Sequence, residues 1–372
     1  MRVLKRLLAF TLCLCAVTTA PSMAADSAGE FATVEPGHRL AFPQDTGAHP
    51  AFRTEWWYAT GWLNQPDGKP LGFQITFFRS ATGHNPADPS AFAPSQLIIA
   101  HAALSDPSLG RLAHDQKIAR QGFGLAYAKT GNTEVKLDAW QLVRAADGHY
   151  TVTVKANDFT LNLTLTPSGT PLLQGDNGYS RKGPLPAQAS YYYSEPQLRV
   201  SGKVTRASAS NEKPALDTTV AGSAWLDHEW SSTVLSADAL GWDWLGANLA
   251  DGSALMAFKV RGRDGNAVWT HATLRDAQGR VSSFEGKQVD FTPLRTWRSP
   301  RTGTAYPVTE TVRTGDMTWR LDPLMDDQEL DSSQSTGAVY WEGAVSVSRD
   351  NKNVGRGYLE LTGYNKALKL AR

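Results

Sequence analysis

Residues 150–165 read YTVTVKANDFTLNLTL, and apolar side chains recur there at every second position on both sides of a short polar break. The same alternation runs through Phe73, Ile75 and Phe77. A period of two is typical of half-buried β-strands. Asp-Gly pairs, which favour tight hairpin turns, stand at 67–68, 147–148, 251–252 and 264–265. The sequence therefore predicts an all-β chain built of antiparallel β-barrels or sandwiches.

Length and composition limit the classes of function. The chain has 372 residues, which is enough for two domains of ordinary size. Its 37 Lys and Arg residues nearly balance its 36 Asp and Glu residues, which argues against a nucleic-acid binder. The 12 Trp, 11 Tyr and 13 Phe residues favour a β-rich protein with large packed or ligand-holding interiors.

The first 24 residues are typical of a signal peptide. Arg2, Lys5 and Arg6 precede an apolar stretch over 7–17, and small residues flank a cleavage point between Ala24 and Ala25. The apolar stretch is too short to span a membrane, and no later run is long enough to do so. We expect an exported protein that is periplasmic, with secretion as the alternative. Both cysteines, at positions 13 and 15, lie within the signal peptide, so the mature chain has no disulfide.

A weak internal repeat suggests two domains. An aromatic run precedes an Asp-Gly hairpin at 56–58 and again at 242–244, and in both places an apolar strand ending in Arg follows. A stretch rich in Ser, Ala and Asn separates the two copies. The expected division begins with a signal peptide at 1–24 and an N-terminal lead at 25–47. A first β-domain at 48–206, a linker at 207–217 and a second β-domain at 218–368 follow.

The first segment that combines acids with aromatic residues is HPAFRTEWWY at 49–58. Alternation places Glu55 and Trp57 on one face of a strand, and Trp56 and Tyr58 on the other. A carboxylate among large aromatic side chains is costly to bury unless it is paired. The segment therefore indicates either a ligand-binding wall or an ion pair, for which Arg53 is available, that closes one end of a barrel.

A second and a third segment lie near the predicted domain boundary. Tyr191, Tyr192 and Tyr193 place hydroxyl groups on both faces of a strand that Pro196 ends, so they indicate either a cavity wall or a packed edge strand. Residues 227–230 read Asp-His-Glu-Trp and form the densest titratable cluster of the chain. Asp227, His228 and Glu229 are candidate acid–base groups and Trp230 a candidate ligand contact. On a strand, however, His228 points away from Asp227 and Glu229, and a structural histidine at a domain boundary is the alternative.

Two further places are candidates. Asp243 stands between Trp242 and Trp244, and an aromatic pocket raises the pKa of a carboxylic acid so that it can donate a proton. The alternative is a hydrogen-bonded core carboxylate. His101 lies in an apolar run over 97–104 and is more often a core residue than a ligand contact.

Several catalytic motifs are absent from the sequence. It contains no Gly-x-Ser-x-Gly elbow, no second His at the metalloprotease spacing after His228, and no phosphate-binding glycine loop. The mature chain has no Cys or close His pair that suggests a zinc site. We therefore expect no cofactor and no metal.

Three motifs carry a resemblance to a known family: HPxFxTEWWY at 49–58, YYYSEP at 191–196 and WxDHEW at 225–230. Together they resemble the AttH-like secreted proteins, which are related to carotenoid 1,2-hydratase (hydroxyneurosporene synthase). The resemblance covers about residues 48–368 and implies two consecutive lipocalin-like β-domains. Members have been called predicted secreted hydrolases or periplasmic components that accompany ABC transporters. Related hydratases add water across an isoprenoid double bond, and fungal relatives assist pericyclic cyclisations.

These observations leave three hypotheses. The first is an exported protein that binds a hydrophobic small molecule or lipid, with an ABC transporter permease as a possible partner. The second is an enzyme, a hydratase, cyclase or hydrolase, that acts on an apolar isoprenoid-like or lipid substrate through carboxylate and His groups. The third is a structural envelope module. Carboxylates that line a pocket without a cationic partner favour chemistry, whereas carboxylates bridged to Arg favour architecture.

Overall fold

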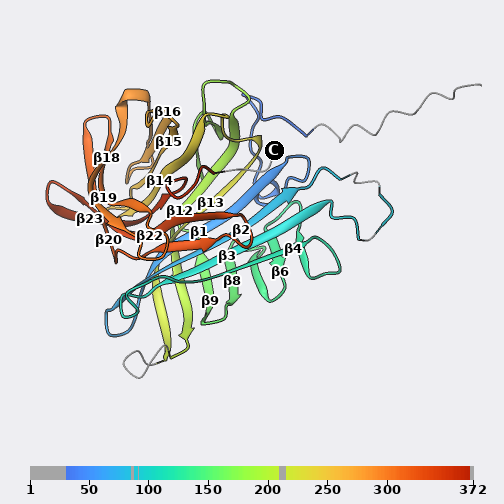
Figure 1. Ribbon diagram of the computed structural model, residues 1–372, viewed down its shortest axis with the longest axis horizontal. Coiled ribbons are helices and arrows are strands. Elements are labelled where there is room, and N and C mark those ends of the chain that lie inside the picture. The colour runs from blue at the N-terminus through green and yellow to red at the C-terminus, as the bar shows by residue number, and fades with distance from the viewer. Residues whose placement is uncertain (1–30, 85–87, 91, 209–214, 369–372) are drawn as a thin grey trace, which may run out of the picture.

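A computed structural model describes residues 31–84, 88–90, 92–208 and 215–368 (Figure 1). The predicted signal peptide and part of the predicted linker, 209–214, lie outside the described residues. Within them the chain forms two antiparallel sheets and two short 3-10 helices, η1 (Gln44–Thr46) and η2 (Gly286–Gln288), and no α-helix. The predicted all-β class is confirmed, and one sheet forms a nearly closed barrel while the other forms a half-barrel. No helix of the described residues is long and apolar enough to cross a membrane.

The first sheet comprises β1 (Thr54–Asn64), β2 (Pro70–Ala81), β3 (Gln96–Ser105), β4 (Ala113–Arg120), β5 (Ala126–Ala128), β6 (Glu134–Leu137), β7 (Trp140–Arg144), β8 (Tyr150–Lys155), β9 (Phe159–Thr166), β10 (Leu172–Leu173), β11 (Tyr179–Arg181), β12 (Ala189–Arg206) and β13 (Leu216–Thr233). Its order is β4-β3-β2-β1-β13-β12-β9-β8-β7-β6-β5, and β10 and β11 pair with β12. The long strands β1, β12 and β13 therefore form the middle of this sheet.

The second sheet comprises β14 (Ala239–Leu249), β15 (Ala254–Gly262), β16 (Ala267–Arg275), β17 (Val281–Glu285), β18 (Val289–Arg298), β19 (Ala305–Thr314), β20 (Met317–Pro323), β21 (Glu329–Ser332), β22 (Ala338–Arg349) and β23 (Lys352–Leu361). Its order is β17-β16-β15-β14-β23-β22-β20-β19-β18, and β21 pairs with β22. Strand β23 packs against β1, and β22 packs against β2, so the second sheet lies across the middle of the first (Figure 1).

The hairpins follow from the sequence pattern. Val152, Val154, Leu161 and Leu163, which alternate in the run at 150–165, are all buried in the first barrel. Glycines that follow Asp in the turns have the left-handed backbone that these turns require, with φ of +84° at Gly68. A side chain other than Gly would be strained at such a position.

The division into sheets differs from the predicted division into domains. Strand β13 pairs with both β12 and β1, so the first sheet extends to Thr233. Arg206 pairs with Leu216 at the end of the β12–β13 hairpin, so the strands on both sides of the predicted linker at 207–217 belong to the same sheet. The chain passes from the first sheet to the second between Thr233 and Ala239. A polar, Pro-containing stretch indicates an exposed turn, but it does not distinguish a hairpin turn from a linker.

Candidate functional site

Strands β1 and β13 form a wall with two different faces. They pair so that Trp57 lies opposite His228 and Tyr58 lies opposite Asp227. Because side chains alternate along a strand, Glu55 and His228 face the interior of the first barrel, while Tyr58 and Asp227 face the second sheet. The predicted separation of His228 from its two acidic neighbours therefore occurs in the structure.

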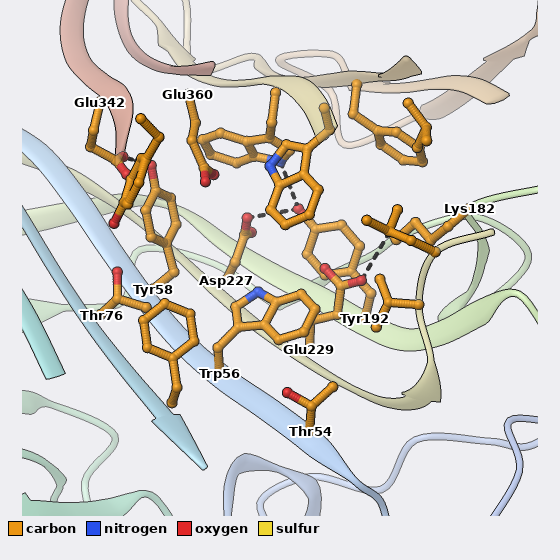
Figure 2. A pocket seen from close by; sticks show the side chains of 18 residues that line it. Thr54, Trp56, Tyr58, Thr76, Lys182, Tyr192, Asp227, Glu229, Glu342 and Glu360 are labelled. Atoms are coloured by element: carbon orange, nitrogen blue, oxygen red, sulfur yellow. Dashed lines mark hydrogen bonds and ion pairs between the residues drawn. The ribbon is translucent and has the colours of Figure 1, made fainter. Parts of the chain in front are cut away.

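A cavity of about 110 Å³ lies between the two sheets, on the outer face of this wall (Figure 2). Eight aromatic side chains line it: Trp56, Tyr58, Phe78, Tyr192, Trp242, Trp244, Phe258 and Tyr340. Val234, Leu235 and Val260 add aliphatic surface. Each of the four candidate segments of the sequence contributes to the lining of the cavity, including Trp242 and Trp244 from β14. The lining is suited to an apolar ligand.

Asp227 is a deeply buried acid of this cavity. Its Oδ1 atom accepts hydrogen bonds from the Ser194 hydroxyl at 2.5 Å and the Trp225 indole at 2.6 Å, and its Oδ2 atom accepts one from the Tyr192 hydroxyl at 2.7 Å. Burial is the main cause that raises the pKa of Asp227 to about 7. The three hydrogen bonds lower this pKa, and the nearby charge of Glu229 raises it. A carboxyl group with such a pKa can give or take a proton near neutral pH.

Two further acids reach the cavity from the second sheet. Glu342 on β22 is 1% exposed and accepts a hydrogen bond from the Tyr58 hydroxyl. Glu360 on β23 is half-buried, and in Figure 2 its carboxyl group points toward that of Asp227. Burial raises the pKa of Glu360 to about 7, and it raises the pKa of Glu342 well above its ordinary value. Both shifts arise because a low-dielectric site disfavours the charged form.

The fourth acid of the cavity has a cationic partner. Glu229 accepts hydrogen bonds from Lys182 at 3.0 Å and from the Ser190 hydroxyl. The Lys182 ammonium also lies 4.6 Å from the centre of the Tyr192 ring and 4.4 Å from that of Phe258. Cation–π contacts of this kind add to the ion pair, so Lys182 is held in place at one end of the cavity.

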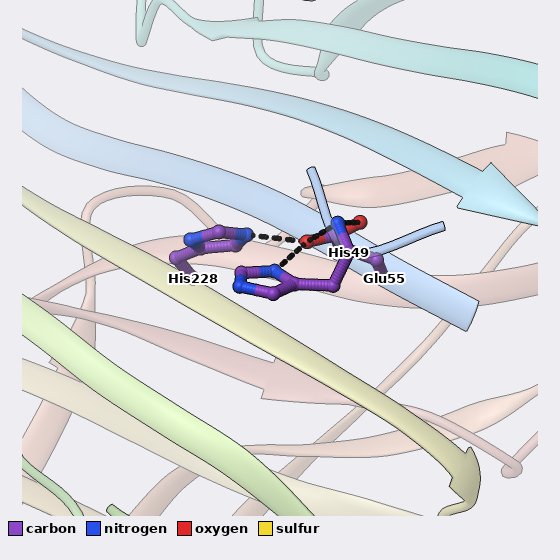
Figure 3. A group of neighbouring side chains, drawn as sticks. All are labelled: His49, Glu55 and His228. Atoms are coloured by element: carbon purple, nitrogen blue, oxygen red, sulfur yellow. Dashed lines mark hydrogen bonds and ion pairs between the residues drawn. The ribbon is translucent and has the colours of Figure 1, made fainter. Parts of the chain in front are cut away.

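A separate network occupies the barrel face of the same wall (Figure 3). The Glu55 carboxylate accepts hydrogen bonds from Arg79 Nε at 2.7 Å, His228 Nε2 at 2.9 Å and His49 Nδ1 at 2.7 Å. Trp57 stacks on His228, and Trp230 stacks on His49 with ring centres 3.7 Å apart. The cation that pairs with Glu55 is Arg79, its direct partner across β1 and β2, and not Arg53 as the sequence suggested.

Within the described part of the chain, this network contains the one group of side chains whose spacing could hold a metal ion. One ligand atom each from His49, Glu55 and His228 lies within 4.8 Å of the others. However, Glu55 also accepts hydrogen bonds from Arg79 and from the His49 backbone amide, at 2.9 Å for the latter. Both carboxylate oxygens of Glu55 are thus already satisfied, Oε1 by the two imidazoles and Oε2 by the Arg79 guanidinium. The arrangement suits a hydrogen-bonded ion pair rather than a metal.

The other predicted site residues lie outside the cavity. Asp243 points into the half-barrel of the second sheet, called the second barrel below, where it meets Arg261 Nε at 2.9 Å, Lys259 Nζ at 3.2 Å and the Tyr364 hydroxyl at 3.0 Å. Its aromatic neighbours Trp242 and Trp244 line the cavity because they lie on the opposite face of β14. The structure therefore brings neither His228 nor Asp243 to the cavity, and both are bridged to cations or carboxylates.

Three more predicted residues stand behind the cavity wall. His101 is buried, its Nδ1 atom lies 2.9 Å from the Tyr340 hydroxyl, and burial lowers its pKa to about 3. Tyr191 and Tyr193 pack on the barrel side of β12 with Trp230. Of the tyrosine triplet only Tyr192 lines the cavity. Alternation along β12 explains this division.

Sequence reasoning missed Glu342, Glu360 and Lys182. Glu342 follows Tyr340 and Trp341, so an acid beside aromatic residues was a usable signal there. Glu360 and Lys182 stand in ordinary surroundings in the sequence, and only strand pairing and loop packing bring them to the cavity.

Comparisons with known proteins agree with this fold. The AttH-like family model matches residues 33–364. A protein of Nitrosomonas europaea whose crystal structure is described as that of a candidate AttH is 59% identical; the match covers 90% of this chain and 100% of that chain, with a TM-score of 0.83. No curated protein sequence matches the chain.

More distant structures share the architecture. Kievitone hydratase from Nectria haematococca is 13% identical over 91% of this chain and 97% of its own, with a TM-score of 0.66. CghA in a complex with Sch210972 is 16% identical over 84% of this chain and 89% of its own, with a TM-score of 0.51. At these identities the similarity shows the fold alone.

Proposed function

The chain belongs to the AttH-like family, and from this membership and the geometry of the cavity we propose that it is an enzyme that protonates an apolar, unsaturated small molecule. The reaction class that fits best is addition of water across a carbon–carbon double bond, or a cyclisation started by the same protonation. The aromatic wall supplies the binding surface, and the carboxyl groups supply the proton.

One observation carries this proposal. Asp227, Glu342 and Glu360 face an aromatic cavity, and none of the three forms an ion pair within the described residues. Glu55 and Asp243, which face the two barrels, are both bridged to arginine. A carboxylate buried without a counter-charge destabilises the fold, so its presence in a cavity indicates chemistry.

The chemistry requires no other group. A neutral carboxyl group of the cavity transfers its proton to one alkene carbon, whose π electrons form the new C–H bond and leave a cation on the neighbouring carbon. The faces of the surrounding rings and the resulting carboxylate stabilise that cation. Water then adds to the cation and gives up one proton to a carboxylate such as Asp227. The net change is the addition of one water molecule.

Binding without turnover is the second candidate, and the aromatic lining is the observation that favours it. In that case the protein holds a hydrophobic molecule or lipid and passes it on. Export to the periplasm and an ABC transporter permease as partner belong to this proposal. The name of kievitone hydratase supports the first candidate, because a hydratase of the same fold exists.

The experiment uses geranylgeraniol, an isoprenoid alcohol with several double bonds, in water labelled with heavy oxygen. We expect quenching of Trp fluorescence on binding and the appearance of labelled oxygen in the product by mass spectrometry. Asp227→Asn is expected to lower the initial rate by at least about 100-fold. Asp217→Asn, which changes an exposed acid of the same strand, serves as the matched control. Binding without labelled product would favour the second candidate, and absence of both would refute the proposed ligand class.

A further inference from the structure

Glu342 and Glu360 are direct partners across strands β22 and β23. Directly opposed residues of an antiparallel pair have Cβ atoms about 4.5–5.5 Å apart and side chains on the same face. Both side chains line the cavity, and in Figure 2 they lie on either side of the Tyr58 hydroxyl, with Asp227 below Glu360. Two like charges at these positions would repel each other strongly.

Among the described residues that line the cavity, no positive charge is left unpaired to relieve this repulsion. The titratable groups that face the pair across the cavity are Tyr58, Tyr192, Lys182, Asp227, Glu229 and Tyr340. Lys182, the only cation among them, is bound to Glu229. Asp227 and Glu229 add negative charge near Glu360. Full ionisation of both glutamates in this buried site is therefore strongly disfavoured.

We propose that Glu342 and Glu360 form an electrostatically coupled carboxyl pair that carries one proton at neutral pH, and that Glu360 delivers this proton to the molecule bound in the cavity. The delivery step rests on the function proposed above; the shared proton does not. Two buried carboxyl groups on directly opposed residues repel each other when both are charged, so they titrate as a unit, with one group ionising easily and the other with difficulty. The pair is thus a proton store at neutral pH.

The two members have different roles because their surroundings differ. Glu342 is 1% exposed, and its Oε1 atom accepts a hydrogen bond from the Tyr58 hydroxyl, so this carboxyl group is held in place and is closed off from a ligand. Glu360 is half-buried and its carboxyl group points into the cavity, so it is the member that a ligand can reach. Glu360 gives up the proton, the electrons of its O–H bond stay on the carboxylate, and the two negative charges that remain stabilise a cation on the ligand. Solvent protons restore the pair after product leaves.

The shared proton is tested without any ligand. Infrared difference spectra of the full mature chain between about pH 5 and pH 9 record the carbonyl band of protonated carboxyl groups. We expect a band in the wild-type protein that persists at neutral pH and that weakens in both Glu342→Gln and Glu360→Gln. Glu342→Gln and Glu360→Gln each remove one charge, so the remaining acid is expected to ionise at least tenfold more readily. Glu310→Gln, at a buried acid of the second barrel, is the matched control and leaves the titration of the pair unchanged.

Two results would overturn the shared proton: full ionisation of both groups at neutral pH in the wild-type protein, or titration of each group at the same pH whether or not the other is present. Near-ultraviolet circular dichroism verifies that the variants are folded. The delivery step is tested with geranylgeraniol, where Glu360→Gln is expected to lower the initial rate by at least about 100-fold. A wild-type rate in Glu360→Gln would refute Glu360 as donor. If the wild-type protein itself shows no turnover, the proposed function fails while the spectra still decide the shared proton.

Discussion

Replacement of Glu55 by glutamine is expected to destabilise the protein far more than the same replacement of Glu360. Glu55 is fully buried and paired with Arg79, which is itself 1% exposed. Glutamine keeps the volume, but its NH₂ group faces donors, and the Arg79 guanidinium loses its counter-charge. Breaking a buried ion pair in this way costs about 3–5 kcal/mol of unfolding free energy.

The matched replacement, Glu360→Gln, has the opposite electrostatic effect. It removes a carboxyl group that has no ion-pair partner in the described residues and whose neighbour Glu342 is also acidic. We expect its unfolding free energy to stay within about 1 kcal/mol of wild type or to rise. Urea unfolding followed by Trp fluorescence at pH 7 compares the two variants with the wild-type protein.

The pH dependence adds an independent check on Glu55. Burial opposes its ionisation, but hydrogen bonds from His228 and His49 and the charge of Arg79 outweigh burial and hold the pKa of Glu55 far below its ordinary value of 4.5. Ionised Glu55 therefore stabilises the folded state above pH 4.5, and this contribution declines as the pH falls below 4.5. Glu55→Gln should lose that part of the acid sensitivity. If Glu55→Gln lowers the unfolding free energy at pH 7 by less than about 1 kcal/mol, the view that this network is structural is refuted.

Three further outcomes are expected. Because the pKa of Glu360 is raised from 4.5 to about 7, its stabilising contribution is present below pH 4.5 and is lost as the pH rises through about 7, so Glu360→Gln should flatten this decline in urea titrations. An apolar ligand should still quench Trp fluorescence in Trp230→Ala, since Trp230 faces the barrel, whereas Trp56→Ala should weaken the quenching; equal effects would place the ligand elsewhere. The mature protein in the periplasmic fraction should begin near Ala25, and N-terminal sequencing that finds the first 24 residues would contradict export with cleavage.

The sequence was sufficient for the class of fold and for much of the cavity wall. Alternation alone divides Asp227 and Glu229 from His228, and the pairing of β1 with β13 agrees with that division. The same rule selects Tyr192 from its triplet. These inferences succeed because a strand fixes the direction of each side chain relative to its neighbours.

The site residues that the sequence did not predict correctly depend on contacts between strands that are distant in the sequence. Asp243 stands between two cavity-lining tryptophans in the sequence, but it faces the other way and meets Arg261. Glu360 reaches the cavity only because β23 pairs with β22 and packs on β1. The predicted linker at 207–217 does not coincide with the passage between the sheets, because composition does not reveal which strands pair on either side of a polar stretch. Register and packing between sheets cannot be deduced from a local pattern.

The two faces of the β1–β13 wall depend on each other. On the barrel side, Glu55 is ionised and gains from Arg79 and two histidines; on the cavity side, Asp227 is buried without a cation and weakens the folded state when it ionises. The same strands carry both groups, with Glu55 and Asp227 only three positions apart in register. A rigid network on one face therefore holds in position the acids that the other face could not stabilise by itself. It follows that replacement of Glu55, which does not line the cavity, should make the cavity wall less rigid. Replacement of Glu360 should change the chemistry of the cavity and leave the β1–β13 wall intact.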